Sequence, residues 1–428
     1  MMGLHITVRE YARLTTAPVQ QANLDYAQIP VTMFDWLCSL STGYRTQHTL
    51  TLAVLEDRRT LFLDNYVGII QSPCGAVLEI LPKIHNEESN VQRSRMMLKE
   101  MITVALDIPV KEAGLTDLDQ FQLPLNEWVA QQFLNHLSLL LKKGIRSDYR
   151  KEEHHEPFLR GQMNVSKQMR QLPGKDHLFY MRYAIFSPDR AENRLLVSAL
   201  TLIIKHTQNL DIWRQAREQA IVLNEIPLSK KIAKDLQSWQ EDRLMSHYKP
   251  IKPWCELILS SYMPLALFGK THGISILFPM EKVFERYVEI MLRKSLLPTV
   301  KMKSQAQKHS LCLHNYRDFF QLRPDILLED SSQCWVLDAK WKRLNSLDVN
   351  SKYGLSQADF YQLYAYGQKY MHGKGDMALI YPEHKDFNEP LPPFYYSSEL
   401  RLWVLPFALE GKNKGKLLHG NATKLPLT

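Results

Sequence analysis

The pattern of apolar and polar positions predicts a β-rich start to the chain. Short apolar runs with a period near two are typical of strands, and turn residues separate them here. One early stretch, residues 33–40, has the spacing of a helix instead. We therefore expect a small β-rich N-terminal domain over residues 1–88, with strands near residues 4–8, 49–55, 61–63, 67–71 and 76–81.

Apolar residues at helical spacing dominate the middle of the chain. Residues 91–106 and 125–141 predict long helices, and prolines and glycines interrupt the segment between them. No repeat period is visible in this region. The pattern predicts a mainly helical connector over residues 89–275, with further helices over residues 193–206, 212–221 and 232–244.

The pattern changes after residue 278, where strands and helices begin to mix. Met280, Phe284 and Val288 form an apolar stripe at helical spacing, and Pro279 suits the first position of that helix. We expect an α/β domain over residues 276–410 and a mobile basic tail over residues 411–428, so the whole fold is a mixed α+β one. The other elements predicted here are a helix over residues 357–371 and strands near residues 299–303, 310–313, 378–381 and 400–405.

Two short apolar runs, separated by polar residues 329–333, predict a β-hairpin within the C-terminal domain. With the turn centred on residues 331–332, antiparallel pairing places Asp325 opposite Asp338. Directly opposed side chains have Cβ atoms roughly 4.5–5.5 Å apart, and like charges so placed are destabilising unless a cation lies between them. Because side chains alternate along a strand, Asp338 and Lys340 share a face. The hairpin is therefore expected to gather two carboxylates and one ammonium.

This set of side chains suits metal-dependent hydrolysis of a phosphodiester. Carboxylate oxygens hold Mg²⁺, which polarises a phosphate and lowers the pKa of bound water, and the ammonium orients that water or stabilises developing charge. An ordinary hairpin with two solvent-facing acids would have the same spacing. The position favours a functional site, because residues 334–337 are apolar on both faces and predict a buried strand. Charge at the end of a buried strand usually has a purpose.

The motif Pro324-Asp325 followed by Asp338-Ala339-Lys340 resembles the PD-(D/E)xK nuclease signature. The surrounding sequence resembles the McrC family, the nuclease subunit of McrBC-type modification-dependent restriction systems. The resemblance covers most of the chain. Supporting matches lie near the motif at residues 284–288 and 359–366, and upstream at residues 78–84, 158–161 and 192–194.

The resemblance implies a C-terminal domain of the restriction-endonuclease-like fold and a Mg²⁺-dependent DNA endonuclease. The resemblance implies that Asp325 and Asp338 are metal ligands and that the Lys340 ammonium lies near the scissile phosphate. Glu285 resembles the helix-borne acid that supplies a further metal ligand in many such nucleases, although a surface acid would look the same. Gln362, one helical turn before Tyr366, resembles the family's motif after the catalytic lysine.

The resemblance also implies partners. These are double-stranded DNA and an oligomeric AAA+ GTPase of the McrB type, which would dock on the N-terminal and helical regions and whose hydrolysis this chain would stimulate. Self-association for double-strand cleavage is a further expectation. The chain has no GxxxxGK[ST] loop, so we expect it to bind no nucleotide itself.

Two other functions stay open from the sequence. One is an assembly subunit that activates the motor with an inert nuclease fold, which the intact Asp325, Asp338 and Lys340 oppose. The other is a stand-alone repair nuclease, which about 280 residues of preceding scaffold oppose. DNA cleavage by the chain with and without its partner separates the three.

Net charge and cysteine content add little to the prediction of function and partners. A formal net charge of +8 and a pI near 9.0 are compatible with a polyanionic partner without requiring one. A dense charged run over residues 146–156 suits either phosphate contacts or a solvated loop or hairpin, and we favour the second. Five isolated cysteines indicate reduced thiols. With no signal sequence and no bilayer-spanning apolar run, we expect a cytoplasmic protein that does not contact a membrane.

Overall fold

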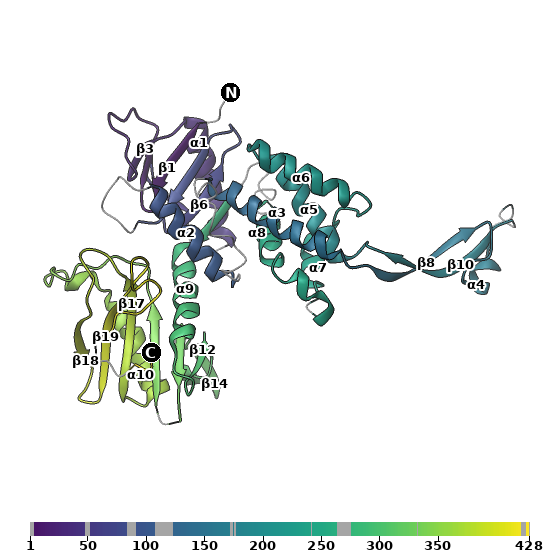
Figure 1. Ribbon diagram of the computed structural model, residues 1–428. Helices are drawn as coiled ribbons and strands as arrows, with labels where there is room; N and C mark the ends of the chain where they lie inside the picture. Colours follow the sequence, from purple (N-terminus) through teal and green to yellow (C-terminus); the bar gives the residue numbers. More distant parts are fainter. Residues whose placement is uncertain are drawn as a thin grey trace. The chain divides into compact units, whose positions relative to one another are not determined.

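The computed structural model describes residues 4–47, 52–83, 91–107, 123–171, 174, 177–240, 242–262, 275–331, 333–420 and 425–427. The chain forms two compact units (Figure 1). The first combines Met1–Leu125 with Ser275–Thr428, and the second is the intervening segment Asn126–Ile274. The second unit is therefore an insertion within the first. Among the described helices, none has the length and apolar character needed to cross a bilayer.

Two four-stranded sheets form the N-terminal module of the first unit. One has the order β1 (His5–Arg9), β7 (Val77–Leu81), β6 (Tyr66–Gln71) and β11 (Ser275–Pro279), with β1 and β7 parallel and the other neighbours antiparallel. The other has the order β3 (Tyr26–Gln28), β2 (Arg13–Thr15), β5 (Thr60–Leu63) and β4 (Ala53–Asp57). Helices α1 (Val31–Gln47) and α2 (Val91–Ala105) complete the module.

Strand β11 joins this module to the C-terminal domain. It pairs with β6, far earlier in the chain, and helix α9 (Met280–Ser295) begins directly after it. Gly68 of β6 has a φ of +135°, and a Cβ there would lie 1.9 Å from the Ile276 carbonyl oxygen. Only glycine allows so close an approach. We had expected Pro279 to be the first helical residue, but it is the N-cap residue that precedes the helix.

A six-stranded mixed sheet forms the core of the C-terminal domain. Its order is β12 (Lys301–Ser304), β15 (Ile326–Glu329), β16 (Cys334–Ala339), β17 (Gly375–Pro382), β19 (Leu400–Phe407) and β18 (Leu391–Tyr395). Helix α10 (Gln357–Met371) covers one face, where its Leu363 shares a core with Val336 and Val404. Helix α9 covers the other face, where Phe284 contacts Phe407. The central strand β16 is thereby buried on both sides, as its sequence predicts.

A small exposed hairpin precedes the β15–β16 pair. It consists of β13 (Ser310–His314) and β14 (Arg317–Gln321), and nearly all of its residues are exposed. The short 3₁₀ helix η4 (Lys352–Gly354) lies before α10. Of these elements, the sequence pattern predicted β13 and missed β14.

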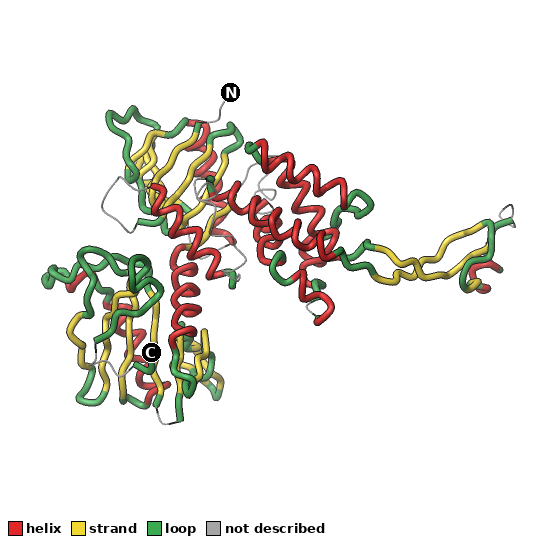
Figure 2. Tube along the Cα trace, viewed as in Figure 1, coloured by secondary structure: helices red, strands yellow, loops and turns green. Residues whose placement is uncertain are grey.

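The second unit is a cluster of helices with one long hairpin. The helices are α3 (Leu125–Lys143), α5 (Ala191–His206), α6 (Leu210–Val222), α7 (Ile232–Gln237), η2 (Arg243–Tyr248) and α8 (Lys252–Tyr262). The hairpin pairs β8 (Asp148–Glu156) with β10 (Phe179–Ser187) and carries β9 (Gln162–Met163) and α4 (Val165–Gln168) at its far end (Figure 2). Most of the charged run over residues 146–156 thus forms a hairpin strand, β8, one of the two structures that its composition suggested.

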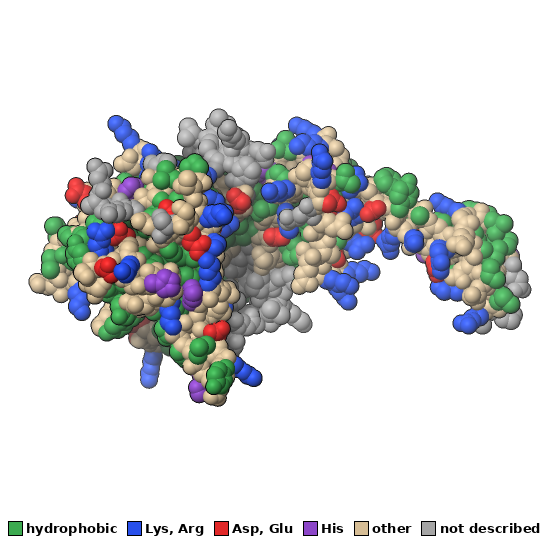
Figure 3. All heavy atoms as spheres, turned by 90° about the horizontal axis from the view of Figure 1, so that it is seen from below, with side chains coloured by type: hydrophobic (Ala, Val, Ile, Leu, Met, Phe, Trp, Pro, Cys, Tyr) green, Lys and Arg blue, Asp and Glu red, His purple; other side chains and the backbone are tan. Residues whose placement is uncertain are grey.

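Asn193 and Tyr248 fasten the root of that hairpin. The Tyr248 hydroxyl donates to Asn193 Oδ1 at 2.7 Å and accepts from the Arg146 N–H at 2.8 Å, and Asn193 Nδ2 donates to the Arg146 carbonyl at 2.9 Å. Four side chains toward the hairpin's far end are exposed although apolar, namely Phe158, Leu159, Val165 and Met169. Apolar side chains are visible there in Figure 3, whereas Lys and Arg side chains are spread over the face shown.

The unit boundaries differ from those expected from the sequence. Described residues of 89–125 belong with the first unit, because α2 packs against α9 and β7. The expected helix over 232–244 is two short helices, α7 and η2. The described part of the expected mobile tail is instead attached: Leu417 pairs with Phe407, Leu427 pairs with Leu296, and Lys414 forms an ion pair with Glu100.

Candidate active site

The β15–β16 hairpin has the register that the sequence predicts. Ile326 lies opposite Leu337, and the Asp330 N–H donates to the Gln333 carbonyl at 3.0 Å at the turn. The same register, continued by one residue beyond β15, sets Asp325 opposite Asp338. The structure therefore brings together Asp325, Asp338 and Lys340 at one end of the buried strand.

Asp338 is the most buried member of the group. It is 1% exposed, and Lys340 Nζ lies 2.7 Å from its Oδ2 atom. Burial, and then the charge of Asp325, raises the pKa of Asp338 above its ordinary value, while Lys340 acts in the opposite direction. Burial lowers the pKa of Lys340, but the carboxylates of Asp338, Asp325 and Asp359 raise it further than burial lowers it. The lysine therefore stays protonated and partly neutralises a crowded set of acids.

Asp325 is held by backbone and side-chain donors from two neighbouring segments. Its Oδ2 accepts from the Ala339 N–H at 3.1 Å, and its Oδ1 accepts from Gln305 Nε2 at 2.9 Å. The Gln305 N–H also donates to the Asp325 carbonyl at 3.0 Å. These bonds fix the orientation of the carboxylate relative to the end of β16.

Two tyrosines of α10 hold the segment that leads into Asp325. The Tyr366 hydroxyl donates to the Arg323 carbonyl at 3.0 Å and accepts from Gln362 Nε2 at 2.7 Å. One turn later, the Tyr370 hydroxyl lies within hydrogen-bond distance of the Leu322 carbonyl, at 3.0 Å. Gln362 is thus linked to the segment before Asp325 by its hydrogen bond to Tyr366. No hydrogen bond is seen between Gln362 and the two aspartates.

Glu285 approaches the site from α9, the helix on the other face of the sheet. It is half-buried and lies 2.7 Å from Lys282 Nζ. Burial, and then the charge of Asp325, raises its pKa, whereas Lys282 and Lys340 lower it. Glu285 is therefore close enough for Asp325 and Lys340 to change its pKa, but its ion pair is with Lys282.

Asp359 belongs to the same charged environment, although the sequence analysis did not select it. It lies in the first turn of α10, it raises the pKa of both Asp338 and Lys340, and the Tyr381 hydroxyl lies 3.5 Å from its Oδ2. Its only signal in the sequence is its place at the start of residues 359–366, the helix segment that matches the family.

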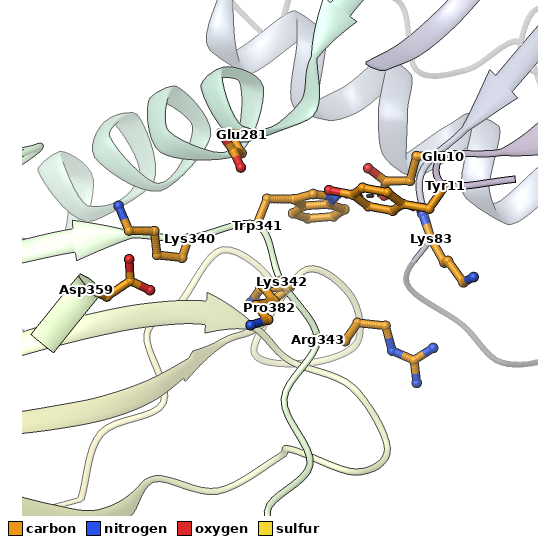
Figure 4. A pocket seen from close by; sticks show the side chains of 10 residues that line it. All are labelled: Glu10, Tyr11, Lys83, Glu281, Lys340, Trp341, Lys342, Arg343, Asp359 and Pro382. Atoms are coloured by element: carbon orange, nitrogen blue, oxygen red, sulfur yellow. Dashed lines mark hydrogen bonds between the residues drawn. The ribbon is translucent and has the colours of Figure 1, made fainter. Parts of the chain in front are cut away.

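A cavity of about 550 Å³ opens beside Lys340. Lys340 and Asp359 lie at one end of it, and Glu10, Tyr11 and Lys83 of the N-terminal module lie at the other (Figure 4). Its remaining lining residues are Glu281, Trp341, Lys342, Arg343 and Pro382. Cations from both the N-terminal module and the C-terminal domain therefore face a space next to the candidate site.

The donor set suits a metal that keeps part of its water shell. In the described part of the chain, no three Asp, Glu, His or Cys side chains form a set that holds a metal unaided. Mg²⁺ is usually bound by one or two carboxylates together with water and substrate phosphate, and Asp325 and Asp338 supply two. Asp338 Oδ2 is buried without a hydrogen bond of normal geometry, and burial, followed by the charge of Asp325, raises the pKa of this acid although Lys340 lowers it. These residues fit a divalent cation at this position.

Comparison with solved structures supports the fold. The chain has a TM-score of 0.67 with a chain of "Refined half-complex from tetradecameric assembly of Thermococcus gammatolerans McrB AAA+ hexamers with bound McrC", at 15% identity over 94% of both chains. The TM-score is 0.51 with a chain of the Thermococcus gammatolerans McrBC complex solved by cryo-EM, at 18% identity over 68% of this chain and 87% of that chain. At these identities the likeness concerns the fold.

Sequence comparison gives the family. No curated protein sequence matches the chain. A family model described as "McrBC 5-methylcytosine restriction system component" matches residues 61–382, which is well over half of the chain and includes the Asp325, Asp338 and Lys340 group. The chain therefore belongs to the McrBC family of restriction system components.

Proposed function

We propose that this chain is the Mg²⁺-dependent DNA endonuclease subunit of a McrBC-type restriction complex. The observation that carries the proposal is the juxtaposition of Asp325, Asp338 and Lys340 at the end of a buried strand, in a chain of this family. Two opposed carboxylates beside a protonated lysine are suited to phosphodiester hydrolysis, and a cation bound between them would offset their mutual repulsion.

The residues divide the work by their chemistry. Asp325 and Asp338 would hold Mg²⁺, with Glu285 a further acid that acts on the same site, and the metal would supply Lewis-acid activation of the phosphate and a more acidic bound water. Lys340 would hold its ammonium near the scissile phosphate, where it stabilises the charge that develops. Gln362 would act through Tyr366 by keeping the segment before Asp325 in place.

An AAA+ GTPase of the McrB type is the partner that we propose for this subunit, with double-stranded DNA as substrate. The two solved chains described above come from McrB–McrC assemblies of Thermococcus gammatolerans. The exposed apolar side chains of the β8–β10 hairpin are a surface suited to such a partner, because groups of this kind commonly mark protein contacts. The family description makes DNA that contains 5-methylcytosine the first substrate to test.

One reconstitution experiment tests the proposal. The chain alone, the partner alone and their mixture are incubated with methylated or unmethylated plasmid, nucleoside triphosphate, and either Mg²⁺ or EDTA. We expect cleavage only in the complete mixture with Mg²⁺, and we expect Asp338→Asn to abolish cleavage while still stimulating triphosphate hydrolysis.

The other outcomes identify the competing functions. Cleavage by the chain alone would indicate a stand-alone nuclease. Stimulation of hydrolysis with no cleavage under any condition would indicate an activator subunit whose nuclease fold is inert.

A further inference from the structure

A buried hydrogen bond connects the candidate active site to the N-terminal module. Trp341, the residue after Lys340, donates from Nε1 to Glu10 Oε1 at 2.8 Å. The same oxygen accepts from the Lys83 N–H at 2.7 Å, just after β7. Trp341 is 6% exposed and Glu10 is 1% exposed. One carboxylate oxygen therefore joins two segments of the N-terminal module to the backbone that carries the lysine.

The backbone around Lys340 depends on this connection because regular strand pairing stops there. The Lys340 N–H still donates to the Ile380 carbonyl of β17 at 2.8 Å, but β16 itself ends at Ala339. The next anchor along the chain is the Trp341 side chain, held by Glu10 on one side and packed against Phe284 of α9 at 5.2 Å between ring centroids. Lys340 is thus placed between a strand bond and a side-chain bond.

The N-terminal module supports the opposite flank of the site in the same way. Its strand β11 leads directly into α9, and the Met280 N–H donates to the Asn65 carbonyl at 2.9 Å. Helix α9 carries Glu285. The helix that carries this acid and the segment that carries Lys340 are therefore both hydrogen-bonded to the N-terminal module.

Two features of the Glu10 segment cost free energy, which indicates that the segment has a role other than packing. Tyr11 has a φ of +62°, an uncommon conformation for an aromatic residue that costs free energy. Glu10 Oε2 is buried with no hydrogen-bond partner among the described residues, which also costs free energy. A neutral amide would hold the same two donors without a buried charge.

We infer that Glu10 is a positioning residue for the nuclease site: through Trp341 it fixes the backbone of Lys340, so the N-terminal module is part of the catalytic framework. This inference rests on the function proposed above. A displacement of about 1 Å of a catalytic group is enough to reduce a rate by roughly 100-fold. Loss of the Glu10–Trp341 bond should therefore lower kcat far more than it changes KM.

The test uses the full chain with its AAA+ partner and a plasmid substrate. Glu10→Ala and Trp341→Phe each remove the bond, and the second keeps an aromatic ring beside Phe284. We expect kcat for cleavage to fall about 10- to 100-fold in both, with KM within about twofold, and the double variant to be no slower than either single one. Glu10→Gln keeps the acceptor oxygen and should restore kcat to the wild-type value.

Matched controls separate positioning from general destabilisation. Leu14→Ala removes a fully buried side chain from the other sheet of the same module and should lower the thermal midpoint without changing kcat at a permissive temperature. Glu56→Ala removes the exposed partner of Arg13 and should change neither quantity. Wild-type kcat in Glu10→Ala and Trp341→Phe overturns the inference, and so does an equal loss of kcat in Leu14→Ala.

Hydrogen exchange keeps this test separate from the proposed function. Amides of residues 340–343 should exchange faster in Glu10→Ala and Trp341→Phe than in the wild type, Glu10→Gln or Leu14→Ala. If the wild type cuts no DNA under any condition, the proposed function fails while this measurement still decides whether Glu10 fixes the Lys340 segment. Unchanged exchange at residues 340–343 in both bond-deleting variants overturns the inference.

Discussion

The carboxylate of Asp325 accepts a hydrogen bond from the backbone N–H of Ala339 at 3.1 Å. Ala339 lies between Asp338 and Lys340, so this bond fastens the first acid of the site to the strand end that carries the other two charged groups. The charge of Asp325 and this hydrogen bond can therefore be separated by substitution, because an asparagine retains one acceptor oxygen for the Ala339 N–H while its amide nitrogen replaces the oxygen that accepts from Gln305.

Asp325→Asn should abolish cleavage while preserving the hairpin. The loss of one carboxylate charge removes a proposed metal ligand, and we expect cleavage to fall at least 10³-fold, or about 4 kcal/mol. Because Asp325 raises the pKa of Asp338, the same change should lower that pKa, which carboxyl NMR titration measures independently of activity. Cleavage near the wild-type rate would remove Asp325 from the site.

Lys340→Ala should slow cleavage without preventing metal binding. Loss of an oriented group that stabilises developing charge typically costs roughly 3 kcal/mol or more, which is about 10²-fold to 10³-fold in rate. Single-turnover cleavage and calorimetric Mg²⁺ titration measure the two effects. Lys342→Ala is the matched control, because Lys342 is an exposed lysine two residues after Lys340 and beyond the end of β16. A larger loss from Lys342→Ala would reassign the lysine.

Tyr366→Phe should loosen the segment that leads into Asp325. The change removes a hydroxyl that donates to the Arg323 carbonyl and accepts from Gln362, so we expect a loss of about 1–2 kcal/mol in the free energy of unfolding, with slower cleavage. Chemical denaturation and cleavage assays measure these effects. Tyr361→Phe removes an exposed hydroxyl from the same helix and should have little effect on either quantity. Equal behaviour of the two variants would argue against this anchor.

Glu10 should make the stability of the protein depend on pH. Burial raises the pKa of this carboxyl from 4.5 to about 7, against the opposing effects of the Lys83 N–H, Trp341 and the Lys83 charge. The folded state therefore keeps the proton longer than the unfolded state, and the contribution of Glu10 to stability falls as pH rises from about 4.5 to about 7. Over that window the loss is roughly 3 kcal/mol.

Denaturation of the wild type and of Glu10→Gln across this pH range measures the effect. The stability difference in favour of the glutamine variant should grow as pH rises and level off above about pH 7. A difference that is constant with pH would mean that Glu10 titrates as an ordinary exposed acid.

Met169→Asp should weaken coupling to the AAA+ partner without harming the fold. Met169 is 83% exposed near the far end of the β8–β10 hairpin, so a charge there disturbs no core. We expect weaker partner binding and less stimulation of triphosphate hydrolysis, with an unchanged thermal midpoint. Leu347→Asp, at a residue 87% exposed in the C-terminal domain, is the control. If Met169→Asp stimulates normally, the partner binds elsewhere.

The sequence predicts those parts of the candidate site that are specified by residues close together in the chain. The turn and the alternation of side chains fix the pairing of β15 with β16, so Asp325, Asp338 and Lys340 followed from a short stretch of sequence. Helix α10 likewise has the bounds that its apolar spacing predicts. Both elements are specified by residues that are neighbours in the chain.

Contacts between distant segments could not be predicted in this way. Glu10 and Trp341 are 331 positions apart, and no periodicity relates them. Strand β10 was missed because its alternating pattern contributes to a hairpin with little core, and most of its residues are only partly buried. Asp359 drew no attention because an acid in the first turn of a helix is common on stability grounds alone.

The place of β11 in the chain has a consequence for synthesis on the ribosome. The Asn126–Ile274 unit is continuous in the chain, so we expect it to fold once it has left the exit tunnel, whereas the β1–β7–β6–β11 sheet is complete only after Ser275–Pro279 has been made. Until then β6 presents an unpaired edge, a hazard for aggregation. The inserted unit therefore matures before the module that precedes it, and a nascent chain arrested before residue 275 should need a chaperone to shield β6.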